Sequence, residues 1–210
     1  MKSKKKVFVT VLCAVLLVAA SVLGTMAYLT SNDEVVNTFT VGDVAITLDE
    51  AKVGDDGKAL TGDAAERVKG NSYHIIPGGV YDKDPTVTVT ANSEESYVRA
   101  LVTLTNYDAI YDLPSTIKIS DVFNLNDNWE FKNETVSTDR KTCTYELWYK
   151  NKVGKDVADT KLPAIFTKVT IPGTLTNDQL SGLDGLEINV VAQAIQADGF
   201  ANAAAAWDAF

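Results

Sequence analysis

The stretch that decides the fold is Tyr97–Thr105, which reads YVRALVTLT and lies near the middle of the chain. Every second side chain from Val98 to Leu104 is apolar, and the side chains between them are a mixture of apolar and polar groups. A period of two indicates a β-strand, because successive side chains of a strand point to opposite faces. Both faces carry substantial apolar surface, so the stretch predicts a central strand of a sheet.

Seven other segments have the composition of strands. They are rich in β-branched, aromatic and apolar residues and are separated by Gly, Pro and Asn/Asp turn signals. About eight strands joined by such turns predict an all-β fold, either a β-sandwich or a barrel. Periodicity leaves immunoglobulin-like and jelly-roll topologies open, although no Cys…Trp…Cys core of the antibody type is present. The seven segments are 39–48, 73–76, 86–90, 129–131, 143–149, 164–170 and 186–195.

Helical signals are few and short. Thr176 is a predicted N-cap, and Gln179 follows three residues later in the capping-box position. A second helical turn is predicted over residues 120–125. The alanine-rich tail at 200–210 predicts a C-terminal helix with Asn202 as its cap. The apolar residues of this tail fall at helical spacing, so we expect the helix to dock on the sandwich.

The N-terminus has the pattern of an export signal. Four lysines within residues 2–6 precede the almost unbroken apolar stretch Val7–Leu23, and the small residues Thr25 and Ala27 follow it. The pattern predicts cleavage after Ala27, so that the mature protein begins at Tyr28 and works outside the cytoplasm. The alternative is a permanent anchor, since the apolar stretch is just short of the ~20 residues that span a bilayer.

The chain is therefore expected to consist of a signal peptide, residues 1–27, and a single domain, residues 28–210, in which the polar segment 50–70 forms a surface loop. Contact with a membrane is expected only through the signal segment before cleavage. Four lysines leave with the signal, so the remaining 183 residues carry 15 Lys and Arg against 28 Asp and Glu, a formal charge of −13. We expect no binding to nucleic acid, whose phosphates require basic partners.

Residues that catalysis or metal binding would need are scarce. His74 is the single histidine, so no histidine pair is available for a zinc site, and its place in the predicted strand 73–76 favours a structural role. Cys143 is the one cysteine left after cleavage, so no intramolecular disulfide is expected, and its strand context predicts a buried thiol. The run NDN at 126–128 is interpreted as a turn rather than a calcium loop. We predict no enzymatic activity, no catalytic residue, no metal and no cofactor.

Four segments recur in an order that is more specific than any one of them. The junction LGTMAYLT at 23–30 is followed by VNTFTVG at 36–42, which places a Gly-Thr-x-Ala exit before an aromatic residue and then an Asn-x-Phe motif. The other three are Ile76–Val89, Ser96–Arg99, and Ala192–Phe200 with Ala206-Trp207 behind it. In this order the segments resemble the TasA/camelysin family of exported proteins, which a SipW-type signal peptidase processes.

The resemblance implies a two-sheet, antiparallel, jelly-roll-like β-sandwich and a role in cell-surface fibres or the biofilm matrix of Gram-positive bacteria. It also implies that the N-terminal segment freed by cleavage pairs with the sheet of the next subunit, by strand addition. The candidate donor segment is Tyr28–Val41, in which Val35, Phe39 and Val41 would fill a neighbour's groove. The alternative, that residues 39–48 pair within their own domain, stays open. Camelysin's protease label is not carried over, because this sequence has no pair of zinc ligands.

Two functions follow as hypotheses. The first is a secreted structural subunit that self-associates into fibres after cleavage by the SipW-type peptidase. The second is a monomeric cell-surface binding module or adhesin, whose aromatic residues would form an exposed platform for a carbohydrate or host protein. The residues of that platform would be Trp129, Trp148, Tyr149 and Trp207.

The cleavage site gives the first testable prediction. N-terminal sequencing of the secreted protein should begin at Tyr28, because the small side chains of Thr25 and Ala27 suit a signal peptidase. Intact Met1–Phe210 recovered only in the lipid fraction would contradict the prediction and favour the permanent anchor.

Overall fold

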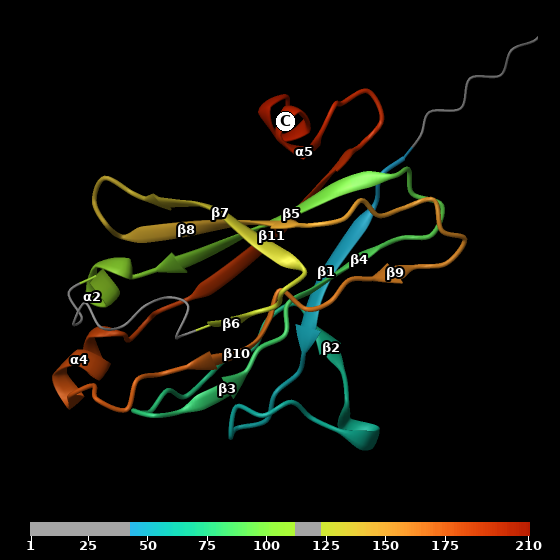
Figure 1. Cartoon of the computed structure of the whole chain (residues 1–210). Coiled ribbons are helices and arrows are strands. Elements are labelled where there is room, and N and C mark those ends of the chain that lie inside the picture. The colour runs from blue at the N-terminus through green and yellow to red at the C-terminus, as the bar shows by residue number, and fades with distance from the viewer. Residues whose placement is uncertain (1–42, 112–122) are drawn as a thin grey trace, which may run out of the picture. The chain divides into compact units, whose positions relative to one another are not determined.

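The computed structural model describes residues 43–111 and 123–210 (Figure 1). This part of the chain is an all-β fold, as predicted, with eleven strands in three antiparallel sheets and a few short helices. The predicted signal peptide and donor segment lie outside the described residues. No helix within the two described ranges is long and apolar enough to cross a bilayer.

The elements follow one another along the chain with short connections. The strands are β1 (Ile46–Ala51), β2 (Arg67–Val68), β3 (Val80–Asp82), β4 (Thr86–Val89), β5 (Ser96–Thr105), β6 (Phe123–Leu125), β7 (Trp129–Val136), β8 (Thr142–Tyr149), β9 (Thr160–Lys161), β10 (Phe166–Thr170) and β11 (Ile188–Gln196). The helices are η1 (Gly62–Ala64, a 3₁₀ turn), α2 (Tyr107–Tyr111), α4 (Asn177–Gly182) and α5 (Ala203–Asp208).

The largest layer is a sheet with the strand order β11-β5-β8-β7. β5 is central, as its sequence predicts, and pairs along its length with β11 on one side and β8 on the other. On the core face of β5 all four alternate side chains from Val98 to Leu104 are at most 2% exposed. On the opposite face Arg99, Leu101 and Thr103 are only half-buried, so the strand has one core face and one partly covered face.

The opposite layer consists of two small sheets rather than the single sheet that a two-sheet sandwich requires. Their strand orders are β2-β1-β4-β9 and β3-β10-β6. The pairs Thr88↔Lys161 and Asp82↔Lys168 show six residues on one chain facing seven on the other, so the register shifts by one residue. Pro85 and Pro163 lie at this break, and proline cannot donate a ladder hydrogen bond. The expectation of two continuous sheets is wrong at this point.

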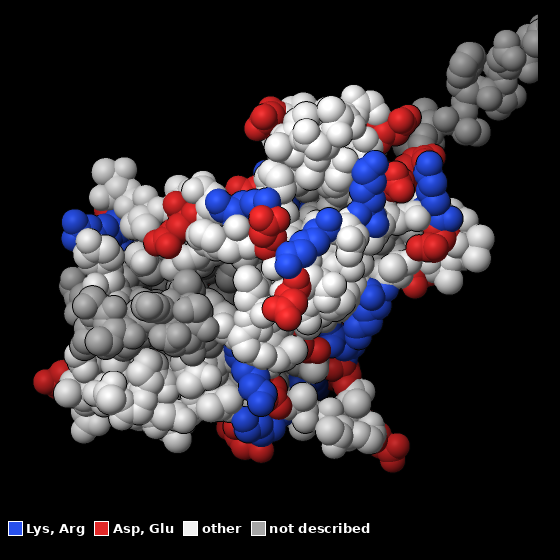
Figure 2. Space-filling model, viewed as in Figure 1, with Lys and Arg blue, Asp and Glu red and all other residues white. Residues whose placement is uncertain are grey.

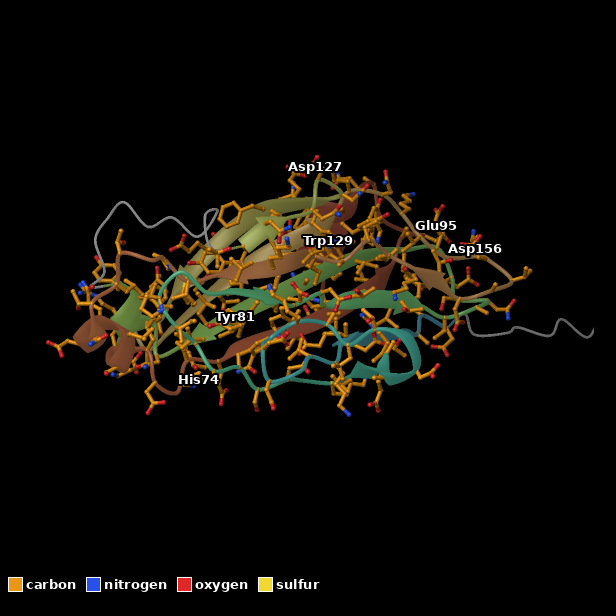
Figure 3. The ribbon with its side chains drawn as sticks, turned by 90° about the horizontal axis from the view of Figure 1, so that it is seen from below. His74, Tyr81, Glu95, Asp127, Trp129 and Asp156 are labelled. Atoms are coloured by element: carbon orange, nitrogen blue, oxygen red, sulfur yellow. The ribbon has the colours of Figure 1, made fainter. Side chains whose placement is uncertain are left out.

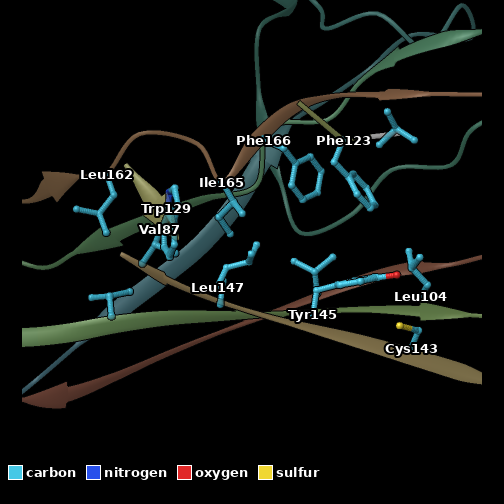
Figure 4. Packing of buried hydrophobic residues seen from close by; sticks show 14 of the residues in the cluster. Val87, Leu104, Phe123, Trp129, Cys143, Tyr145, Leu147, Leu162, Ile165 and Phe166 are labelled. Atoms are coloured by element: carbon cyan, nitrogen blue, oxygen red, sulfur yellow. The ribbon is translucent and has the colours of Figure 1, made fainter. Parts of the chain in front are cut away.

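The main core lies between the two layers and draws on all three sheets (Figure 4). Phe123 of β6 and Phe166 of β10 pack with ring centroids 4.7 Å apart. Trp129 is buried against Tyr149, and its indole Nε1 donates to the Pro163 carbonyl at 2.9 Å. Cys143 is fully buried, as predicted. Burial of large apolar side chains between the layers therefore supplies the main stabilisation.

Both short helices that were predicted from capping residues form. Thr176 and Gln179 make a reciprocal capping box at the start of α4. The side chain of Asn202 accepts a hydrogen bond from the Ala205 amide at the start of α5. Trp207 of α5 is buried against the outer face of the large sheet, where the guanidinium of Arg99 lies 4.4 Å from its ring centroid.

Three local predictions differ from the structure. Residues 73–76 form no strand, because the Tyr81 hydroxyl binds the backbone there: it accepts from the Ile76 amide and donates to the His74 carbonyl. Residues 123–125 are strand β6 and not helix, since Phe123 is needed in the core. The surface segment 50–70 includes the end of β1, η1 and β2, so it has more regular structure than a loop.

Truncation of the core should be costly. Phe166→Ala should lower the free energy of unfolding by about 3–5 kcal/mol, because it removes a side chain that is 1% exposed and leaves a cavity between the layers. The measurement is urea unfolding followed by tryptophan fluorescence. Val157→Ala is the control, since Val157 is 90% exposed and its loss should change the free energy by less than about 0.5 kcal/mol. Equal effects of the two substitutions would contradict the packing described.

Candidate functional site

The two long edges of the large sheet are protected very differently. Edge strand β7 carries Glu130, Lys132 and Glu134, and its pairing with β8 is irregular between Phe131 and Asn133. Charges and bulges of this kind keep an edge from pairing with other chains. Edge strand β11 reads INVVAQAIQ, nine residues with no charge, no proline and no glycine. Among the described strands, β11 therefore combines length with a lack of edge protection.

The backbone of β11 offers a regular row of hydrogen-bonding groups. At its start the Thr105 amide donates to the Glu187 carbonyl at 3.0 Å, and the pairing with β5 continues in register to Gln196. Hydrogen-bonded and non-bonded pairs alternate in an antiparallel ladder. The odd-numbered residues of β11 consequently bond to β5, and the N–H and C=O groups of the even-numbered residues, from Ile188 onward, point to the free edge.

The main core is incompletely covered along the same edge. The core-facing residues of β5 and β8 are buried, whereas Ile188, Val190, Ala192 and Ala194 of β11 are only half-buried. The residues opposite them on β1, Ile46 and Leu48, are also half-buried. An apolar strip of the sandwich interior therefore lies open between β1 and β11.

This opening is a groove of about 1450 Å³. β1 and β11 pass close to each other and then diverge (Figure 1). One wall is β11 with the preceding loop from α4, and the other is β1 with the segment Lys69–Ile75. Tyr81, Val169 and Ile171 of the smaller sheet contribute to the lining. The groove is wide enough for an extended chain, and its lining is a mixture of apolar side chains and backbone.

A buried ion pair holds the β1 wall. Lys83 Nζ lies 2.6 Å from Glu50 Oε2, and the two residues are 8% and 4% exposed. Asn71 donates to the other carboxylate oxygen of Glu50 at 3.0 Å and to the Ala51 carbonyl at 2.8 Å. Because Lys83 precedes β4 and Asn71 lies in the segment after β2, this pair ties three parts of the chain to β1.

A second ionic cluster lies beside the first. Arg67 of β2 bonds to Asp49 at 2.7 Å and to Asp84 at 2.5 Å. Burial by itself would lower the pKa of Arg67, but hydrogen bonds to the two carboxylates and their negative charges outweigh it and raise the pKa. The acidic residues Asp49 and Asp84 are thus neutralised by a protein cation, and within the described ranges no group of three or more His, Cys, Asp or Glu residues is placed to hold a metal ion.

Two further side chains define the floor and rim of the groove. The Tyr73 hydroxyl donates to the Asp82 carbonyl at 3.0 Å, and burial together with the negative charge of Glu50 raises the pKa of Tyr73. Lys69 is exposed, and its Nζ donates to the Leu48 carbonyl at 2.5 Å. This carbonyl lies on the edge of β1 that faces the groove, so Lys69 partly caps that edge, whereas no such side chain among the described residues caps β11.

The residues singled out in the sequence are not gathered at this groove. The cleavage site Ala27/Tyr28 and the donor residues Val35, Phe39 and Val41 lie outside the described residues. His74 is exposed at the outside of the ribbon beside Tyr81 (Figure 3), so the expectation of a histidine in a strand is wrong. The run at 126–128 is a turn in which Asn126 Oδ1 accepts from the Asn128 amide, as predicted.

The four aromatic residues of the alternative hypothesis do not form one exposed platform. Trp129 is 2% exposed and packs with Tyr149 in the main core. Trp207 is 7% exposed and packs with Trp148 under α5. Figure 2 shows basic and acidic side chains interspersed on one face rather than gathered into a patch of a single sign.

Sequence reasoning missed the exposed edge because it depends on pairing. The pattern of residues 186–195 indicated a strand and its two faces, but a period of two carries no information on which neighbours a strand has. The lack of charges in this segment was the available signal. Comparisons of this chain with protein-family models, with curated proteins and with solved structures find no match.

The ion pair at the groove wall can be tested by a double-mutant cycle. Lys83→Met should lower the free energy of unfolding by about 3–5 kcal/mol, because it leaves the Glu50 carboxylate buried without its cation. The double variant Lys83→Met/Glu50→Leu should recover most of this loss, since it removes both charges. Urea unfolding of the four proteins gives the coupling free energy. Simply additive losses would contradict a buried, mutually dependent pair.

Proposed function

We propose that the protein is an exported structural subunit of cell-surface fibres or biofilm matrix, of the TasA/camelysin kind and without enzymatic activity. A SipW-type signal peptidase cleaves it after Ala27, and the freed segment Tyr28–Val41 adds as a strand to the sheet of another copy. The fold of the described part is then one jelly-roll-like sandwich in a signal-bearing precursor. The motifs of the signal junction and the order of the four segments support this proposal.

The observation that carries the proposal is the unprotected edge of the large sheet. Strand addition needs an acceptor that presents free backbone groups and an apolar surface for alternate side chains. β11 has an uncharged sequence, and the core beside it is only half covered. A protein that functions as a monomer would be expected to blunt such an edge, as β7 is blunted by its charges and irregular pairing.

The alternative of a monomeric binding module has less support. Its aromatic platform is divided between the main core and the cluster under α5. Buried Trp129 and Trp207 act as packing residues, and a ligand would reach neither without opening the fold. Self-association therefore remains the function that the described surface favours.

Assembly of the mature chain tests the proposal. The protein beginning at Tyr28 should form oligomers or filaments, seen by light scattering with size exclusion and by electron microscopy, with and without calcium or acid. Phe39→Asp should reduce assembly at least about tenfold, because a charge on the apolar face of the donor would have to be buried. Thr40→Asp is the matched control, since residue 40 falls on the opposite face of the same strand pattern.

A chain that remains monomeric under all of these conditions would contradict the proposal. Equal loss of assembly in the two aspartate variants would contradict the assignment of the donor face, because the effect would then follow from net charge alone.

A further inference from the structure

We propose that the free edge of β11, with the groove between β11 and β1, is the acceptor site for residues 28–41 of a second copy of this chain. This inference rests on the proposed function and adds to it the surface, the backbone groups and the side chains that receive the segment.

The hydrogen-bonding capacity of β11 suits an added strand. The outward-facing residues are the even-numbered ones, and none of the described strands pairs with them. β11 has nine residues, which span about 30 Å at the usual rise per residue. The segment 28–41 is long enough to cover this edge completely, with residues to spare for the connection to Asp43.

The side chains of the groove match the pattern of the segment. Residues 35, 39 and 41 share one face of an extended chain, because they differ by even numbers, and they are Val, Phe and Val. The half-buried side chains of Ile188, Val190 and Ala192 face the same interior. Insertion would bring these two apolar rows together and complete the cover of the main core.

Charge favours the same occupant. Lys69 lies at the rim of the groove, and it makes no ion pair with any carboxylate in the described part of the chain. Asp33 and Glu34 stand at the start of the apolar stretch of the donor. An acidic pair at one end of the inserted strand would meet this cation at the rim, where both stay partly in water.

The position of the first described residues favours a second copy over the chain's own segment. The Asp43 carbonyl accepts from the Glu94 amide at 2.9 Å, and Ala197, just after β11, donates to the Glu95 carbonyl at 2.7 Å. The chain therefore enters the domain beside the C-terminal end of β11. Its own donor segment would have to fold straight back from this point to lie along β11, whereas a segment that extends outward reaches another copy.

Hydrogen exchange on single residues tests the acceptor directly. The acceptor is the mature chain carrying Phe39→Asp, which keeps its own segment from inserting, and the probe is a synthetic peptide of residues 28–41. Amide exchange of Val190, Ala192 and Ala194 should slow at least about tenfold when the peptide is added, because their N–H groups gain partners. Exchange of Val191 and Gln193, which face β5, should change little. A peptide of the same composition in scrambled order is the control.

A proline at each long edge gives an independent test in the otherwise natural mature chain. Ala192→Pro removes an outward N–H of β11 without removing a bond to β5, so it should abolish assembly while the fold is kept. Val136→Pro removes an outward N–H of β7, where Ser137 and Thr142 form the neighbouring bonded pair. It should leave assembly unchanged. Circular dichroism establishes that both variants are folded.

The outcomes separate this inference from the proposed function. If the natural chain assembles and Ala192→Pro assembles equally well, or if the peptide slows exchange elsewhere, the acceptor is not β11 although the proposed function stands. Slow exchange at the even-numbered residues before peptide is added, at all protein concentrations, would assign the groove to the chain's own segment. Protection that grows with protein concentration without peptide would indicate edge-to-edge pairing of two copies. If Ala192→Pro does not fold, the exchange experiment decides.

Discussion

Every sheet with two ends leaves two rows of backbone donors and acceptors without partners, and this constraint shapes the whole surface of the protein. The large sheet meets it at β7 by the charges of Glu130, Lys132 and Glu134 and by irregular pairing. At β11 it does not meet it within the described residues. The short strands of the opposite layer limit their exposed backbone by length, since β2 and β9 have two residues each. The contrast confines the open hydrogen-bonding surface to one side of the sandwich.

The groove keeps its shape because charged residues hold one of its walls. The Lys83–Glu50 pair and the Arg67 cluster join β1, β2 and the start of β4 through side chains. A buried ion pair contributes little net stability, because the cost of removing both charges from water offsets their attraction. Its effect here is on geometry: Glu50 must stay where Lys83 and Asn71 reach it, so β1 cannot close onto β11. An apolar wall would have been free to collapse over the strip that stays half exposed.

The sequence predicted the parts of the fold that depend on local pattern. β5, β8 and β11 follow from a period of two, and the caps of α4 and α5 follow from Thr176 and Asn202, because a cap is an interaction between neighbours in the chain. The strand predicted at 73–76 and the helix predicted near 123 failed, because Tyr81 and the core decide those backbones from a distance. The division of one layer into two sheets depends on Pro85 and Pro163 meeting across the pair, and the groove depends on strand order. Neither can be read from one segment alone.

An open edge on a secreted domain must also be reconciled with solubility. Loss of the signal would remove four lysines and leave a formal charge of −13, so mature copies repel one another at long range. At physiological salt this repulsion decays over about 8 Å, whereas ladder hydrogen bonds act between strands less than about 5 Å apart. Repulsion therefore slows encounters without opposing a strand that is already seated. The uncharged sequence of β11 is then safe in dilute monomers, because protection comes from the charge of the domain as a whole and not from the edge itself.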